Sequence, residues 1–234
     1  MDPKRVVITG MGIISSVGKD LDTYWNNLKN GVCGIDYVEE FKDMPVTFAG
    51  KVKDFDPEQY GMDKPFVRKQ DHFTQYAMAA AWQAMQQSGL CSEGEGANID
   101  PYRLGVYVGS GIGGFEVQYR ETQKMLEDPT GKWISPLFIA TMISNIAAGH
   151  VAIKHHAEGP CLDIVTACAT SSHCIGERRS VLFVTAMPMP SSPAARNTHP
   201  SPWGWPVSST PRPSPVPRTP NMRPSPSTPT GRAL

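Results

Sequence analysis

The first ninety residues alternate between short apolar runs and amphipathic stretches. Residues 6–9 are apolar or β-branched, which predicts a strand, and Gly10 and Gly12 end it with a turn. Asp20 is a candidate N-cap, and apolar residues then recur at helical spacing until Gly31: Leu21, Trp25 and Leu28. This part of the chain therefore predicts a strand, a loop and a helix.

A second helix is expected after an irregular stretch. Residues 33–69 mix charges with three prolines and show no regular pattern. From Asp71, large apolar residues follow a helical pattern up to a stop at Gly89: Phe73, Tyr76, Met78, Trp82 and Met85. The interior of this segment is rich in alanine, which lets a helix pack closely against a neighbour.

The same order of strand, glycine and helix then recurs. Residues 104–108 predict a short buried strand, and the glycine-rich loop 109–114 separates it from a polar helix at about 115–127. A helical pattern follows within 135–156, and an apolar strand at 162–165 leads to Ala167 and Cys168. Strands that alternate with helices predict an α/β layered fold with a largely buried sheet.

The composition changes at Arg178. The segment 178–234 holds 14 of the 22 prolines and seven arginines, and it contains no Asp, Glu, Lys or Ile. Too few apolar residues remain to offset the entropy of ordering, so we expect a disordered, proline-rich tail at 179–234 after a body at 1–178. The abrupt change also suggests a reading-frame shift, because guanine- and cytosine-rich codons read out of frame give such a composition.

The zero net charge is the sum of an acidic body and a basic tail. The tail has few aromatic residues beyond Trp203 and Trp205, so we expect no nucleic-acid binding. Residues 211–215 match ligands of proline-binding domains, as many proline-rich stretches do. We expect no secretory or membrane segment, and the five cysteines, at no metal-ligand spacing, indicate reduced thiols in the cytoplasm.

Cys168 is a candidate nucleophile because of its position between two predicted elements. It follows a predicted buried strand and precedes small residues that open a predicted helix: Ala169, Thr170, Ser171 and Ser172. A thiol at a helix start faces unpaired backbone N–H groups, which stabilise a thiolate and can hold an oxyanion. The alternative is a plain buried cysteine, since free cysteine is among the most buried residue types.

The segment 159–171, Gly-Pro-Cys-Leu-Asp-Ile-Val-Thr-Ala-Cys-Ala-Thr-Ser, resembles the active-site signature of the β-ketoacyl-acyl-carrier-protein synthases. The resemblance extends through residues 6–12, the loop 109–114 and six further positions: Ser135, Pro136, Phe138, Asn145, Gly149 and His150. It covers nearly all of residues 1–178 and is closest to the elongating, type II enzymes. It implies the N-terminal half of a thiolase-like layered fold and a homodimer.

The resemblance also implies a reaction. In the family, the cysteine takes an acyl chain from acyl carrier protein, and malonyl-acyl carrier protein then loses carbon dioxide and attacks the thioester. Cys168 matches that nucleophile, its backbone N–H matches half of the oxyanion hole, and Ile112 and Phe138 match residues that border the acyl pocket. No metal or cofactor is implied, and a fragment of a polyketide-type ketosynthase is an alternative.

In the family, two histidines and a lysine of the active site come from a second half of the fold. In this chain the proline-rich tail begins where that half would follow. His173, five residues after Cys168, falls well round a helix from the thiol, and His155 and His156 suit a helix end. We therefore expect that the chain does not condense acyl and malonyl units by itself.

Two other interpretations stay open. Gly109, Gly111 and Gly114 satisfy the nucleotide-binding spacing G-x-G-x-x-G after a strand, although no well-placed acidic residue follows to hold a ribose. The other is a non-catalytic truncated subunit that pairs with a full-length partner, because half a core leaves an apolar face uncovered.

Overall fold

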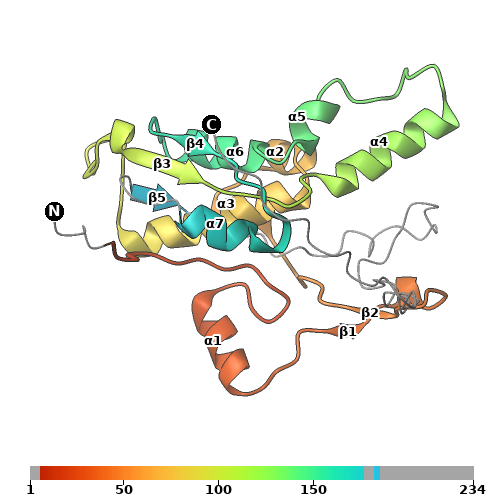
Figure 1. Cartoon of the computed structure of the whole chain (residues 1–234), viewed down its shortest axis with the longest axis horizontal. Coiled ribbons are helices and arrows are strands. Elements are labelled where there is room, and N and C mark those ends of the chain that lie inside the picture. Colours follow the sequence, from red (N-terminus) through yellow and green to blue (C-terminus); the bar gives the residue numbers. More distant parts are fainter. Residues whose placement is uncertain (1–5, 177–181, 185–234) are drawn as a thin grey trace, which may run out of the picture. The chain divides into compact units, whose positions relative to one another are not determined.

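A three-stranded parallel sheet forms the middle layer of the fold (Figure 1). The computed structural model describes residues 6–176 and 182–184. β3 (Leu104–Tyr107) is the middle strand, between β4 (Cys161–Leu162) and β5 (Leu182–Val184). Val106 of β3 pairs in parallel register with Cys161 of β4 and with Val184 of β5. The first three residues of β3 are fully buried, as the sequence predicts.

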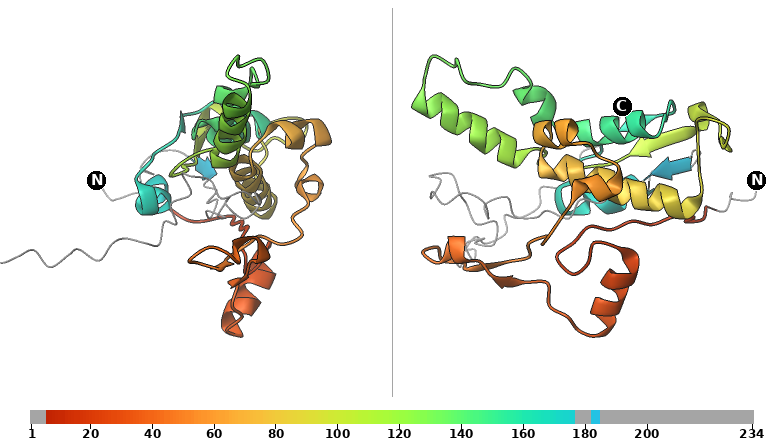
Figure 2. Two further views of the ribbon diagram at one scale, coloured as in Figure 1. Left: turned by 90° about the vertical axis from the view of Figure 1, so that its right-hand side faces the viewer. Right: turned by 180° about the vertical axis from the view of Figure 1, so that it is seen from behind.

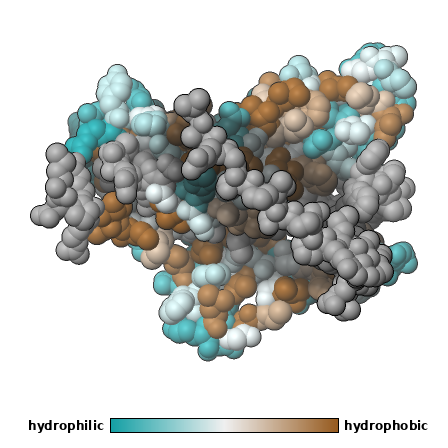
Figure 3. All heavy atoms as spheres, viewed as in Figure 1, coloured by the Kyte–Doolittle hydropathy of each residue, from teal (hydrophilic) through white to brown (hydrophobic). Residues whose placement is uncertain are grey.

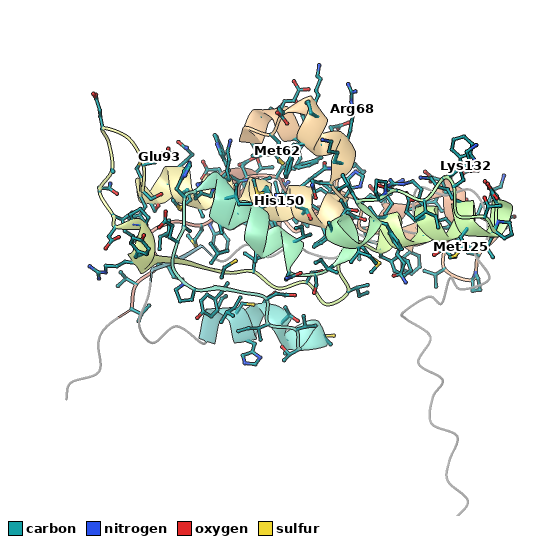
Figure 4. All side chains as sticks on the ribbon, turned by 90° about the horizontal axis from the view of Figure 1, so that it is seen from above. Met62, Arg68, Glu93, Met125, Lys132 and His150 are labelled. Atoms are coloured by element: carbon teal, nitrogen blue, oxygen red, sulfur yellow. The ribbon has the colours of Figure 1, made fainter. Side chains whose placement is uncertain are left out.

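Helices cover both faces of this sheet. α3 (His72–Ser88) and α6 (Ile146–Lys154) lie on one face, and α7 (Thr170–Gly176) lies on the other (Figures 2 and 4). In Figure 4, His150 marks α6, which packs against α3. This order of helix, sheet and helix confirms the predicted α/β layering.

α3 has locally specified ends and an interior that packs closely. Asp71 accepts the Phe73 N–H at its start, and Gly89 takes a φ of +65° at its end, as predicted. Four of its buried alanines are at most 1% exposed: Ala77, Ala79, Ala80 and Ala81. Small side chains let the helix backbone approach its neighbours, and the main core gathers around it: Ile14, Leu104, Val106, Val108 and Val151.

The strand predicted at residues 6–9 is wrong. These residues form no strand, and three of them are 62–68% exposed: Val6, Val7 and Ile8. The chain continues along α3, where Gln87 accepts the backbone N–H of Met11 at 2.7 Å. A strand forms only beside a hydrogen-bonding neighbour. Among the described residues, none of the strands pairs with residues 6–9.

Only short elements follow between residues 20 and 70, in agreement with the irregular pattern. α1 (Leu21–Lys29) begins as predicted, with Asp20 accepting the Thr23 N–H at 2.8 Å, but none of its residues is buried. Trp25 of α1 is accordingly 60% exposed. Hydrophobic residues also lie open at the bottom of Figure 3. The other elements are antiparallel β1 (Asp36–Tyr37) and β2 (Phe48–Ala49), α2 (Lys64–Lys69), and 3₁₀ turns at Glu39–Phe41 and Pro57–Tyr60.

The helical pattern of 135–156 forms two helices instead of one. α4 (Phe115–Glu127) has its predicted bounds, but α5 (Phe138–Met142) ends at Ile143, whose ψ of 141° is extended, before α6 begins. The break coincides with close packing on the glycine loop, since a Cβ at Gly113 would lie 2.4 Å from the Met142 carbonyl oxygen. Hydrophobic spacing alone does not register such a contact.

β5 was not predicted from the sequence. Its three residues fall within the range 179–234 that the composition assigns to the tail. The rest of that range lies outside the described residues, so the tail stays a prediction. A further 3₁₀ turn lies at Pro101–Arg103, directly before β3. Among the helices of the described segments, none is long and apolar enough to cross a lipid bilayer.

Candidate active site

Cys168 lies on a sharp turn between β4 and α7. A 3₁₀ turn at Ala167–Ala169 leads directly into α7. Ala167 has a φ of +49°, in the left-handed region that residues with a Cβ rarely adopt. The Thr166 N–H donates to the Thr170 hydroxyl at 2.9 Å and ties the two sides of the turn together. Backbone strain of this kind persists only where the surroundings impose it, and it is frequent at functional sites.

The two cysteines nearest this turn have different environments. Cys168 is exposed, and among the described residues its backbone N–H has no hydrogen-bond partner. Cys174 on α7 is 1% exposed, with its sulfur 3.8 Å from the Ile164 carbonyl oxygen. Burial raises the pKa of the Cys174 thiol. The environment of a core cysteine therefore belongs to Cys174 and not to Cys168.

The strand that leads to Cys168 is shorter and more open than predicted. β4 covers two residues instead of 162–165, and Leu162 and Val165 are each 48% exposed. The expectation of a buried strand is therefore wrong. β4 is an edge strand whose only strand neighbour in the described part of the chain is β3, so its other side stays open to solvent.

The glycine-rich loop 109–114 packs against this turn. A Cβ at Gly109 would lie 2.4 Å from Thr170 Cγ2 and 2.5 Å from the Ile164 carbonyl oxygen. On the other side of the loop, a Cβ at Gly114 would lie 2.8 Å from the Thr141 carbonyl oxygen. The protein's own atoms occupy the space beside both glycines. These two glycines are explained by close packing, and the nucleotide-binding interpretation has no such support.

Asp71 holds the end of the same loop, which sequence reasoning missed. Its carboxylate caps α3 and also accepts the Val117 N–H in the first turn of α4, at 2.9 Å. Asp71 is 6% exposed, and burial raises the pKa of its carboxyl group, which these two N–H donors partly oppose. The partners lie 46 residues apart in sequence. The N-cap position of Asp71 was visible in the pattern, but its second partner was not.

Ile112 and Phe138 lie on two different elements near Cys168, the glycine loop and α5. Ile112 is 68% exposed on the glycine loop, and Phe138 is the half-buried first residue of α5. A cavity of about 460 Å³ lies at the start of α3, lined by residues that include Gln75, His72 and Glu116. The acyl-pocket roles of Ile112 and Phe138 stay predictions.

Four histidines lie on or directly after α3 and α6, the helices on the other face of the sheet from α7. His72 on α3 pairs with Glu116 at 2.7 Å, and His150 on α6 packs edge-on against the Phe66 ring. His155, at the end of α6, has its pKa lowered to about 4, chiefly by burial, and its neighbour His156 pairs with Glu93. The described segments contain no group of three or more histidine, cysteine or carboxylate side chains that could bind a metal ion.

The turn at Cys168 and the glycine loop belong to a longer stretch of sequence that matches a known protein family. The model of the β-ketoacyl synthase N-terminal domain matches residues 3–181. The chain belongs to the β-ketoacyl synthase family. A 3-oxoacyl-[acyl-carrier-protein] synthase 2 from Staphylococcus aureus (strain N315) is 42% identical over 176 residues, which are 74% of this chain and 41% of that relative. The Vibrio cholerae protein of the same name is 43% identical and aligns over 75% of this chain and 42% of its own length.

Solved β-ketoacyl synthases also share the fold. The crystal structure of a β-ketoacyl synthase from Burkholderia phymatum STM815 superposes with a TM-score of 0.61 at 25% identity, over 75% of this chain and 43% of that structure. This similarity confirms the thiolase-like class inferred from the signature at 159–171. The chain spans 41–42% of the length of the Staphylococcus aureus and Vibrio cholerae relatives.

Proposed function

We propose that Cys168 is the acyl-accepting nucleophile of a 3-oxoacyl-[acyl-carrier-protein] synthase that elongates fatty acids. The observation that carries the proposal is an exposed thiol on the strained turn that joins β4 to α7, packed against the glycine loop, within a signature shared with the family. In the reaction, the Cys168 thiolate attacks the carbonyl carbon of an acyl-carrier-protein thioester. A new C–S bond forms at Cys168, and the thiol of the carrier protein leaves.

The backbone N–H of Cys168 supplies one donor for the oxyanion that develops on the attacked carbonyl oxygen. It is without a hydrogen-bond partner among the described residues, so no internal bond must break before it donates. Ile112 and Phe138 are proposed to border the acyl chain. Their elements, the glycine loop and α5, meet where Gly113 contacts Met142, which supports a shared role.

Condensation with a malonyl unit is a separate step that we expect this chain not to perform. In the family, the histidines for that step come from the second half, and in this chain His72 and His150 belong to α3 and α6, across the sheet from α7. The partner proposed for the first step is acyl carrier protein, and the intact family fold is proposed to form a homodimer in the cytoplasm. The name of the Staphylococcus aureus relative supports the carrier protein as partner.

The test is acyl transfer to the purified chain, followed by intact mass and peptide mapping. Incubation with an acyl-carrier-protein thioester is expected to add one acyl group, at Cys168, and Cys168→Ala is expected to abolish the adduct. Cys161→Ala is the matched control, because Cys161 is also exposed. If Cys33 or Cys91 is acylated as readily as Cys168, the turn does not form a specific acyl-accepting site. Formation of a product two carbons longer with malonyl-acyl carrier protein would refute the predicted loss of condensation.

A truncated, non-catalytic subunit is the second candidate function. The observation that favours it is apolar surface left open on α1 and β4, where Trp25 and Leu162 are 60% and 48% exposed. Large uncovered apolar areas mark surfaces that bind a partner. Stable co-purification with a full-length synthase, together with no acylation of Cys168, would support this function over the first.

A further inference from the structure

Three segments meet beside Cys168 and contact one another in pairs: the loop 109–114, the turn 142–144 and the segment 163–170. The loop meets the turn at Gly113, and it meets the third segment at Gly109, where a Cβ would lie 2.5 Å from the Ile164 carbonyl oxygen. Both of these contacts are close backbone packing. The turn and the segment 163–170 are instead joined by side chains, because Ser144 Oγ donates to Asp163 Oδ2 at 2.5 Å.

The surroundings of Asp163 offset part of the stability gained from this hydrogen bond. The other carboxylate oxygen of Asp163, Oδ1, is buried and has no hydrogen-bond partner. Removing a carboxylate oxygen from water without a partner costs free energy, which opposes the gain from the bond to Ser144. The main effect of the pair is therefore geometric: it joins the turn 142–144 to the segment 163–170, so that the three segments form a closed frame.

The frame connects two parts of the proposed site. The turn that contains Ser144 follows α5, whose first residue is Phe138, and the segment that contains Asp163 leads to Cys168 five residues later. We infer that Ser144 and Asp163 are positioning residues, which hold α5 at the distance from the Cys168 sulfur that lets an apolar chain on the sulfur lie along Phe138. The inference rests on the proposed role of Cys168 as acyl acceptor.

The experiment compares how Cys168 of the full chain reacts with a short and a long alkyl reagent. In a reaction with methyl or decyl methanethiosulfonate, the thiolate attacks the reagent's sulfenyl sulfur, a disulfide forms and methanesulfinate leaves, so no oxidant is needed. Peptide mapping gives the rate at Cys168 apart from other thiols. The variants are Ser144→Ala and Asp163→Ala, with Asp43→Ala as control at an exposed aspartate. Ser144→Thr and Asp163→Asn retain the donor and an acceptor.

Loss of either partner is expected to lower the rate of reaction with the decyl reagent about fivefold, because that factor corresponds to the net contribution of one ordinary hydrogen bond. The rate with the methyl reagent is expected to stay unchanged. Ser144→Thr and Asp163→Asn are expected to restore the ratio of the two rates, and Asp43→Ala to leave it unaltered. Cys174, which is 1% exposed, reports on the fold and is expected to stay unreactive.

Two results would overturn the inference. One is an unchanged ratio in Ser144→Ala. The other is a parallel rise of both rates together with labelling of Cys174, which is the result of general loosening. Acyl transfer to wild-type Cys168 is measured separately, so its absence would refute the proposed function while the ratio of alkylthiolation rates still tests the pair.

Discussion

Substitution of Gly109 by alanine tests the contact between the glycine loop and the start of α7. The new Cβ would lie 2.5 Å from the Ile164 carbonyl oxygen and 2.4 Å from Thr170 Cγ2, on a residue that is itself 4% exposed. Neither neighbour is the end of a flexible side chain, so the segment around Cys168 must shift by about 1 Å to reach ordinary contact distances. Overpacking of this kind lowers the free energy of unfolding by about 2–3 kcal/mol.

Gly111→Ala is the matched control, two residues along the same loop. Its Cβ would lie 3.8 Å from the nearest neighbour, the Ala167 carbonyl oxygen, which is an ordinary contact. The control is expected to be neutral or to stabilise by about 0.5 kcal/mol, because alanine reduces the entropy of the unfolded chain. Urea unfolding followed by circular dichroism measures both variants.

With a slope of about 2 kcal/mol per molar urea, Gly109→Ala should unfold about 1 M earlier than the wild type. Its native state should also expose the buried Cys174 to thiol reagents sooner, because Cys174 Sγ would lie 3.0 Å from the new Cβ. Equal unfolding midpoints for the two variants would refute the close packing of Gly109.

Three further predictions concern ionisable groups that are buried or partly buried. Asp71→Ala is expected to lower the free energy of unfolding by about 2–3 kcal/mol, because it leaves the N–H groups at the starts of α3 and α4 without their acceptor, and Asp71→Asn by less; chemical unfolding of both measures this, and equal losses would contradict it. Burial tends to raise the pKa of Glu121, but bonds from Lys124 and from the Ser135 N–H hold that pKa below 4.5, so the stability it confers is present above pH 4.5 and is lost below it. Glu121→Gln should therefore destabilise more at about pH 7 than at about pH 3, and melting curves at the two pH values check the sign. The pKa of His155 is lowered from 6.5 to about 4, so the unfolded chain binds the proton first and stability falls as the pH drops from 6.5 to about 4. The loss is at most about 3 kcal/mol, and His155→Gln should remove that part of the pH dependence; an unchanged pH profile would contradict it.

The elements that were predicted well have local signals at both ends. α3 lies between an aspartate that caps its first turn and a glycine that takes a positive φ at its end, and α4 follows the glycine loop within its predicted bounds. Caps and left-handed glycines act within a few residues, so the amino-acid order is enough to place them. The signature around Cys168 is local in the same sense, and it carried the family and the fold class.

The failures involve partners that are distant in the chain. Residues 6–9 have the composition of a strand, but a strand also requires a neighbour to pair with. The helical pattern expected at 135–156 is interrupted at Ile143, where the turn after α5 meets Gly113. The bond between Ser144 and Asp163 joins residues that periodicity places on separate elements. Propensity cannot register contacts that exist only after the elements have packed.

The sequence by itself determined the α/β class, the family and the cysteine on which the proposed chemistry rests. Only the tertiary structure decided that Ala167 is strained and that Gly109 is packed tightly while Gly111 is not. It also decided that Asp71 joins α3 to α4 through Val117, 46 residues away. The physical reason is range: a cap or a signature acts through neighbouring residues, whereas strain and close packing depend on which distant segments come to lie side by side.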